Sequence, residues 1–541
     1  MAFQAHSAQT SPCHAQNFSM LQVPSLTETR TIDMNLQQPT RAITCLAWRT
    51  ASNFAPTFLL ASLLTLLLAL GAVAQTTATT TPAQAPPNFL FILADDQSWS
   101  GLSVEMIAGK DFSKGKNFNT PNTEKLAERG MIFSQAYAAH PKCECSRAAI
   151  LAGRTTTTLN APTKASTNWS MPLTDSLANS LKRANPAYRA AHLGKWQWPM
   201  KPTDLGYDQS DGITQNQTGE SKDPADPKLS LSLTRRACDF MATQVKEDHP
   251  FFLQISFYAV HAPAQALPET LKKYDNLKSP NNGVGNDATK NAAKGSGKGA
   301  KGPGNGPGKE NSTADRATMA AMTQDLDTCV GTLMKKLDEL GIANNTYIIY
   351  MSDNGGRTEI LSGGKGNLGE GGLRVPLIVA GPGIHGATYC NEPVISYDIL
   401  ATVLDFAAPN TALPKGAEGG SWKTVLQNSG AGKVKRSIDR MVWHQPVEVP
   451  HPQSAIRKGD YKLVYEWDTK NAQLFNLVDD LSEKKDLSKE KPELAQQLTA
   501  ELKAHVMAGL GEQACAALAR GETPQNRGGG KKIDSPKDSK P

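Results

Sequence analysis

Residues 88–96 read NFLFILADD, and this stretch decides the fold class. Its apolar run is uninterrupted, which is typical of a strand buried on both faces, as the strands of parallel sheets are. Similar runs occur at residues 251–260 (FFLQISFYAV), 346–351 (TYIIYM) and 376–381 (PLIVAG). Helical patterns lie between them, the clearest at residues 317–341, where apolar side chains recur at helical spacing before a glycine. This alternation predicts an α/β fold with a large, mostly parallel sheet sandwiched by helices.

The pattern changes after about residue 425. Residues 461–467 (YKLVYEW) and 472–477 (AQLFNL) alternate like half-exposed antiparallel strands, and a helical pattern follows at 492–510. We therefore predict a main domain at residues 88–425 and a smaller C-terminal α+β subdomain, with an antiparallel sheet, at residues 426–518.

Three segments have little to bury. Residues 75–87 are rich in Thr, Pro and Ala and are interpreted as a linker. Residues 279–311 are rich in Gly, Asn and Lys, which indicates a flexible surface insertion within the main domain. Residues 519–541 are polar and predicted to be a disordered tail.

The first 74 residues are predicted to be a leader that contains a signal peptide. Residues 57–74 form an uncharged apolar run that ends in the small-residue pattern Ala-Val-Ala. A membrane span is the weaker interpretation, because the run is of borderline length and ends in a cleavage pattern. The region before it is long, so translation starting at Met20 or Met34 stays open. We expect cleavage near Ala74, export to the periplasm or the cell exterior, and no stable membrane anchor afterwards.

Charge and cysteine content exclude two classes. The net charge of +6 is small for 541 residues, and much of the excess lies in segments predicted to be disordered, so we expect no nucleic-acid partner. Eight cysteines are present, two of them in the leader. The remaining six are too sparse for a disulfide scaffold.

Polar residues follow two of the predicted strands. Asp95 and Asp96 follow the first strand, and Asp353 and Asn354 follow the strand at residues 346–351. In open parallel sheets, sites lie at the carboxyl ends of strands. Three carboxylates and an amide are hard oxygen ligands suited to Ca²⁺ or Mg²⁺. The alternative is that these residues only begin turns.

Three further cationic or titratable residues lie in comparable positions. His261 follows the apolar run at residues 251–260, although a single histidine is more often structural. Lys195 and Lys365 both have glycine neighbours, which let an ammonium group and the backbone approach an anion closely. Each lysine taken alone is weak evidence, because a lysine near glycine is normally a solvated surface residue.

Residues 141–154 read PKCECSRAAILAGR. The two cysteines of this stretch allow three interpretations: a disulfide, a metal site, or a nucleophile at the start of a helix. A disulfide between Cys143 and Cys145 would be strained, and no nearby Cys/His pair completes a zinc site. We expect Ser146 to cap the following helix, with Arg147 in its first turn, which makes an anion site. The same field is expected to lower a thiol pKa. Cys143 or Cys145 is therefore a candidate nucleophile beside an anion site and a divalent cation, which indicates transfer or hydrolysis of a phosphate or sulfate ester.

These residues resemble a known family. Residues 143–154 are similar to the type I sulfatase signature C-x-P-S-R-x-x-x-x-T-G-R, and YRAAHLGKWQW at 188–198 resembles the second signature Y-x-T-x-x-x-G-K-W-H-L. PNFLFILADDQ, MSDNGG, GGKGNLGEGGLRVP, SYDILATVLD and the region from AIRKGDYKLVYEW onward resemble further family blocks, in the family's order from about residue 87 to 487. The chain thus resembles the formylglycine-dependent, arylsulfatase-like enzymes of the alkaline-phosphatase-like superfamily.

The resemblance implies a sulfuric ester hydrolase whose Cys143 is converted to formylglycine by a formylglycine-generating enzyme. The hydrated aldehyde attacks sulfur, and its second hydroxyl then releases sulfate. The implied ligands of Ca²⁺, or alternatively Mg²⁺, are Asp95, Asp96, Asp353, Asn354 and the modified Cys143. The implied roles of the others are contacts to the hydrate for Arg147 and Lys195, substrate binding for Lys195, Lys365 and His261, and general acid for His261. Family habit and export favour a sulfated small molecule or polysaccharide as substrate.

Three positions depart from the family pattern. Cys145 replaces the usual proline, a position to which the converting enzymes are sensitive. Ala152 replaces a threonine, and Gln197 replaces the histidine of G-K-W-H. Glutamine can donate and accept hydrogen bonds but cannot act as a base at neutral pH.

Two other functions stay open from the sequence. One is a phosphoesterase or phosphonate hydrolase of the same superfamily, although two-zinc members need additional His and Asp ligands. The other is a non-catalytic relative that binds sulfated glycans, which Gln197 and Cys145 favour. Trp443 and His444 either line the substrate pocket or are buried for structural reasons.

Overall fold

Strand β1 (Asn88–Ala94) lies inside the large sheet of a computed structural model that describes residues 85–159, 172–278, 313–356 and 360–522. Its side chains alternate between two hydrophobic cores. Phe89, Phe91 and Leu93 belong to the core on one face, and Leu90 and Ile92 belong to the core on the other. The apolar run is therefore continuous because both faces of the strand are buried, as the sequence predicted.

The large sheet has eight strands in the order β5-β4-β6-β1-β7-β8-β2-β9. Seven run parallel to one another, whereas β8 is antiparallel to both of its neighbours, β7 and β2. The predicted α/β class with a mostly parallel sheet is confirmed. The strands besides β1 are β2 (Gly130–Phe133), β4 (Arg189–Gly194), β5 (Gln209–Ser210), β6 (Phe251–Ser256), β7 (Thr346–Ser352), β8 (Leu377–Ala380) and β9 (Thr388–Cys390).

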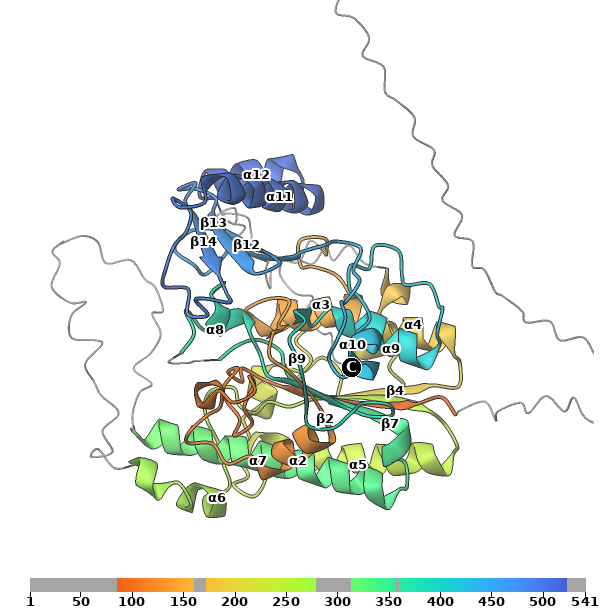
Figure 1. Ribbon diagram of the computed structural model, residues 1–541. Coiled ribbons are helices and arrows are strands. Elements are labelled where there is room, and N and C mark those ends of the chain that lie inside the picture. Colours follow the sequence, from red (N-terminus) through yellow and green to blue (C-terminus); the bar gives the residue numbers. More distant parts are fainter. Residues whose placement is uncertain (1–84, 160–171, 279–312, 357–359, 523–541) are drawn as a thin grey trace, which may run out of the picture. The chain divides into compact units, whose positions relative to one another are not determined.

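Helices cover both faces of this sheet (Figure 1). On one face lie α2 (Pro121–Arg129), α5 (Ser230–Lys246) and α7 (Thr313–Glu339). On the other lie α3 (Cys143–Ala152), α4 (Leu177–Ala184), α9 (Asp398–Ala407) and α10 (Lys423–Gln427). Helix α7 includes most of the predicted helical stretch, and Gly341, with φ of 70°, follows its end. Short elements complete this part: β3 (Ala136–Tyr137), β10 (Val394–Ile395), α6 (Pro268–Lys272) and α8 (Glu370–Leu373).

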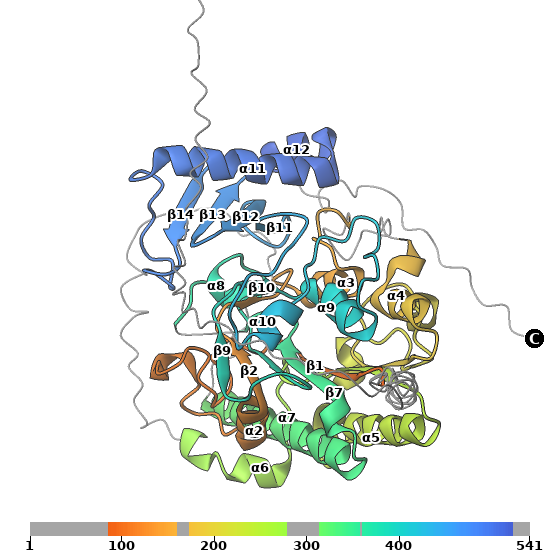
Figure 2. The same cartoon turned by 45° about the vertical axis from the view of Figure 1, so that its right-hand side comes forward.

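The C-terminal part is a four-stranded antiparallel sheet with helix α11 packed against it (Figure 2). Its strands and helices are β11 (Met441–Gln445), β12 (Gln453–Lys458), β13 (Tyr461–Glu466), β14 (Ala472–Asn476), α11 (Pro492–Leu510) and α12 (Glu512–Ala519). The sequence predicted β13, β14 and α11. It missed β11 and β12, because buried polar residues interrupt both apolar patterns: His444 and Gln445 in β11, and Ser454 and Arg457 in β12.

The two sheets are joined by buried polar contacts. Trp443 Nε1 donates to the carbonyl of Ala138 at 2.8 Å, and His444 supplies its carbonyl to His140 Nε2 at 3.0 Å. Lys462 Nζ lies 3.0 Å from Glu370 Oε1, with both side chains fully buried. Trp443 and His444 are thus buried structural residues, which settles the alternative that the sequence left open.

Two local predictions were wrong. The strand predicted for residues 251–260 ends at Ser256, because residues 257–260 turn over the end of β1 and hydrogen-bond to Asp95. Helix α3 begins at Cys143 rather than after Ser146, so Ser146 lies inside its first turn and Lys142 is the N-cap residue.

Several predictions fall on residues outside the described ranges. These are the leader at residues 1–74, most of the linker at 75–87, the insertion at 279–311 and nearly all of the predicted tail. Helix α12 continues one residue beyond the predicted subdomain end at 518, and the other domain boundaries stay predictions. In the part of the chain that the structure describes, no helix has both the length and the apolar character needed to cross a membrane.

Candidate active site

Asp95 and Asp96 follow β1 and point to the same centre. Consecutive side chains of an extended strand point to opposite faces. Asp96 instead points to the same side as Asp95, because its φ is 62°, in the left-handed region, so the extended strand has ended there. Its backbone N–H donates to Asp353 Oδ1 at 3.2 Å. Asp95 is completely buried, with its N–H bonded to the carbonyl of Ala259 at 3.0 Å and its own carbonyl accepting from Val260 at 2.8 Å.

Asp353 and Asn354 follow β7, the strand beside β1. Because Ala94 and Ser352 are paired in the ladder, the residues after them lie at the same edge of the sheet. Asn354 Nδ2 donates to Asp96 Oδ1 at 2.8 Å. Asn354 Oδ1 is buried and has no hydrogen-bond partner among the described residues. The structure thus brings the two predicted pairs together.

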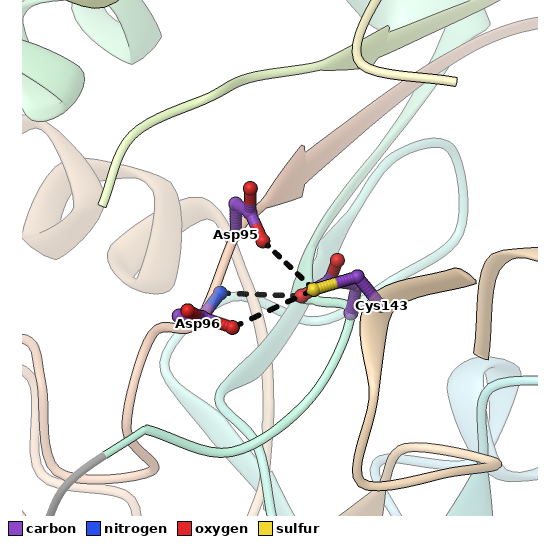
Figure 3. Close-up of side chains that lie close together, drawn as sticks. Asp95, Asp96 and Cys143 are labelled. Carbon is purple, nitrogen blue, oxygen red and sulfur yellow. Dashed lines mark hydrogen bonds between the residues drawn. The ribbon is translucent and has the colours of Figure 1, made fainter. Parts of the chain in front are cut away.

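Cys143 reaches the same centre from the start of α3. Its Sγ lies 3.4 Å from Asp95 Oδ1 and 3.7 Å from Asp96 Oδ1 (Figure 3). One potential ligand atom from each of Asp95, Asp96, Asp353 and Cys143 lies within 4.8 Å of the others. Converging carboxylates repel one another unless a cation lies between them, and the unpartnered amide oxygen of Asn354 offers a further hard ligand. These residues therefore fit a divalent cation.

The expected activation of the Cys143 thiol is wrong. Burial, followed by the negative charge of Asp353, raises the thiol pKa well above its ordinary value, and the positive charge of Lys195 does not offset this. Asp95 and Asp96 also favour the neutral thiol. An unmodified cysteine at this position is consequently protonated at neutral pH and is a poor nucleophile.

Arg147 and Lys195 are buried and form ion pairs with the carboxylates. Arg147 Nε donates to Asp353 Oδ2 at 2.9 Å, and its Nη1 donates to the carbonyl of Lys195 at 2.7 Å. Lys195, the first residue after β4, pairs with Asp95 Oδ2. Burial would lower the pKa of Lys195, but the charge of Asp95 outweighs it, so the ammonium group stays protonated.

The two buried aspartates respond differently to this arrangement. Burial would raise the pKa of Asp95, but Lys195 and Arg147 outweigh it and hold the pKa well below its ordinary value. For Asp353, burial and then the charge of Asp95 prevail over Arg147 and raise the pKa to about 6. A charged Asp95 therefore makes it harder for Asp353 to ionise, and a bound divalent cation would relieve this conflict.

Lys365 and His261 are the more accessible members of the site. Lys365 Nζ donates to Asp96 Oδ2 at 2.7 Å, and His261 Nε2 lies 3.7 Å from the same oxygen. His261 follows the loop at residues 257–260 that is bonded to Asp95. Burial lowers the pKa of His261, although Asp95 and Asp96 act in the opposite direction.

A cavity of about 460 Å³ opens beside Cys143. Its wall includes residues that the sequence did not single out, and these come from loops far apart in the chain. The lining residues are Lys142, Cys143, Glu144, Gln197, Asn216, Lys365, Gly366, Asn367, Glu448, Val449 and Pro450. No local sequence signal marks Asn216 or Glu448, whereas Gln197 stood out because it departs from a family motif.

Comparisons with known proteins identify the family of this chain. The family model described as Sulfatase matches residues 87–408. A sulfatase of Formosa agariphila is 26% identical over 514 residues, which cover 76% of this chain and 86% of the relative. N-acetylgalactosamine-6-sulfatase of Mus musculus is 26% identical over 64% of this chain and 66% of its own length. The crystal structure of Ps i-CgsB with k-i-k-neocarrahexaose is 25% identical and covers 79% of this chain and 94% of that one, with a TM-score of 0.63.

The fold, the acidic centre and these relatives together define a sulfuric ester hydrolase. The chain belongs to the sulfatase family.

Proposed function

We propose that this protein hydrolyses a sulfate ester on a carbohydrate, with a formylglycine made from Cys143 and a bound Ca²⁺. The observation that carries the proposal is the convergence of Cys143 with Asp95, Asp96 and Asp353 within 4.8 Å. The raised thiol pKa supports it, because a sulfatase would use the hydrated aldehyde, and not a thiolate, at this position. Hydrated formylglycine supplies the hydroxyl nucleophile, and Ca²⁺ supplies positive charge beside the sulfate group.

Six side chains of the protein bind the cation or position the residue at 143. Asp95, Asp96, Asp353 and Asn354 hold the cation, and Asn354 does so through its unpartnered Oδ1. Arg147 and Lys195, fixed by their buried ion pairs, hold the residue at position 143 in place.

Lys365 and His261 face the substrate. Lys365 donates one hydrogen bond to Asp96, and its ammonium group has further N–H donors with which it binds a sulfate oxygen. His261 lies next to the same carboxylate, and in its protonated form it can pass a hydrogen from Nε2 to the leaving alcohol oxygen.

A sulfated saccharide is the substrate class that relatives favour. The mouse relative is named for a sulfated amino sugar, and the Ps i-CgsB structure contains an oligosaccharide of six sugar units, as its name states. The cavity of about 460 Å³ has room for a small sulfated sugar unit. The predicted signal peptide adds that the enzyme acts after export, with cleavage near Ala74.

The direct test compares an aryl sulfate with the matching aryl phosphate. We expect the wild-type protein, produced with a formylglycine-generating enzyme and Ca²⁺, to prefer the sulfate. Replacing Cys143 with alanine should lower kcat by at least about 1,000-fold. Cys238→Ala is the matched control, because Cys238 lies on α5 and does not line this cavity.

Mass spectrometry of the tryptic peptide at residues 143–147 provides the second measurement. Formylglycine at position 143 in the active protein is the expected result. An entirely unmodified thiol in active protein, or a preference for the aryl phosphate, would contradict the proposal.

A further inference from the structure

Gln197, Asn216 and His261 form a hydrogen-bonded row at the cavity. Gln197 Nε2 donates to Asn216 Oδ1 at 2.8 Å, and Asn216 Nδ2 lies 3.3 Å from His261 Nε2, to which it donates when that nitrogen carries no hydrogen. A carboxamide has one accepting end and one donating end. Asn216 therefore uses both ends, one on each neighbour, and its position in the row determines how both of them are oriented.

Asn216 is held firmly by the backbone around it. It is the first residue of the short 3-10 helix η4 (Asn216–Gly219), in which Gln215 and Thr218 form a capping box. Gly219 packs so tightly on Tyr258 that an added Cβ would lie 2.1 Å from the ring atom Cγ. Since Tyr258 belongs to the loop that leads to His261, this contact fixes η4 relative to His261.

The preceding loop is fastened to the other side of the row. Gln197 donates its backbone N–H to the carbonyl of Thr214 at 2.9 Å, and Trp196 donates its own to Thr214 Oγ1 at 2.8 Å. The segment at residues 214–216 is therefore bonded to the exit of β4 as well as to His261.

Gln197 retains an unused acceptor. Its Nε2 is occupied by Asn216, while its Oε1 is buried and lacks a hydrogen-bond partner within the described part of the chain. Gln197 lines the cavity together with Cys143. A buried acceptor without a partner is unfavourable, so its placement at the cavity points to a donor that arrives there.

We propose that Asn216 is a positioning residue that orients Gln197 as an acceptor for a hydroxyl group bound in the cavity, and that also holds the ring of His261. This inference rests on the proposed sulfatase function. Sulfate oxygens carry no hydrogen at neutral pH, so the matching donor is a hydroxyl. It belongs either to the hydrated residue at position 143 or to the sugar.

The test uses Asn216→Ala and Gln197→Ala, singly and together. Gln217→Ala is the matched control, because Gln217 is an exposed residue of the same 3-10 helix and lies outside the cavity wall. All variants are compared at equal formylglycine content, measured by peptide mass spectrometry, with 4-nitrophenyl sulfate and with N-acetylgalactosamine 6-sulfate.

We expect Asn216→Ala to lower kcat by about 10-fold while KM changes by less than about 3-fold, since one oriented hydrogen bond is lost. The double variant should be no slower than about the slower single variant, because the two residues act as one unit. Equal losses on both substrates assign the hydroxyl to residue 143, and a loss on the sugar alone assigns it to the substrate.

A binding measurement separates positioning from a general loss of structure. The Kd of inorganic sulfate, measured by calorimetry, should stay within about 3-fold in Asn216→Ala, because sulfate offers Gln197 no donor. A Kd that weakens as much as kcat falls would overturn the inference, as would wild-type kcat on every substrate that the wild-type protein hydrolyses. Absence of sulfatase activity in the wild-type protein would instead contradict the proposed function.

Discussion

Replacing Glu370 with glutamine removes a negative charge from the buried network that joins the two sheets. Glu370 Oε2 accepts from Tyr137 and from Arg374 at 2.8 Å each, and Oε1 accepts from Lys462 at 3.0 Å. Burial would raise the pKa of Glu370, but Lys462 and Arg374 outweigh it and lower the pKa from 4.5 to about 2.

The expected destabilisation follows from this pKa. A difference of one in pKa corresponds to about 1.4 kcal/mol, so the charged carboxylate contributes about 3 kcal/mol to stability at pH 7. An independent value comes from buried ion pairs in general, where removing one partner lowers the free energy of unfolding by about 3–5 kcal/mol. Lys462 keeps Glu483, at 2.8 Å, as a second partner, which favours the lower value.

Urea unfolding of wild type and Glu370→Gln, followed by tryptophan fluorescence, measures this difference. Because the folded pKa is depressed, the contribution is complete above the unfolded pKa of 4.5 and is lost as the pH falls toward 2. We expect the difference to decrease to about 1.4 kcal/mol at pH 3. Glu490→Gln is the control, because Glu490 forms an exposed pair with Lys485 that contributes at most about 1 kcal/mol. Equal stability at pH 7, or a difference that grows toward pH 3, would refute the reasoning.

Three further outcomes are expected. Calcium at 100 times its Kd should stabilise the protein by about 2.7 kcal/mol over the chelated form, and Asn354→Ala should lose most of this gain. Thermal unfolding with and without chelator measures the gain. A wild-type Tm that does not respond to calcium would contradict the prediction. Gly219→Ala should cost about 1–3 kcal/mol, because its Cβ would collide with Tyr258; an unchanged Tm would show that the contact is not tight. Cys145→Pro should raise the formylglycine fraction at position 143 without unfolding α3, because residue 145 lies in the first turn, where proline is tolerated; peptide mass spectrometry and circular dichroism test both parts.

The sequence predicted the centre of the site because strand ends are local signals. Asp95 and Asp353 each follow an apolar run, and β1 and β7 are neighbours, so their carboxyl ends meet. The thiol pKa of Cys143 could not be predicted in the same way. The helix start was visible from the residues nearby, but the distance from Cys143 to three carboxylates depends on the tertiary fold.

Other parts of the site depend on loops whose course no periodic pattern encodes. His261 was placed at a strand end, whereas β6 ends at Ser256 and the following loop carries the histidine toward Asp96. Asn216 was not recognised, because its significance lies in contacts to residues 197 and 261 and not in its neighbours along the chain.

The cavity wall draws on two parts of the molecule with different tasks. The acidic centre comes from the ends of strands in the large sheet, whereas Glu448, Val449 and Pro450 come from the loop between β11 and β12 of the small sheet. This loop contains none of the residues at the acidic centre. If the protein acts on sugars as proposed, mutations in this loop alter which sugars are admitted and leave the reaction centre unchanged, so substrate range can diversify faster than chemistry.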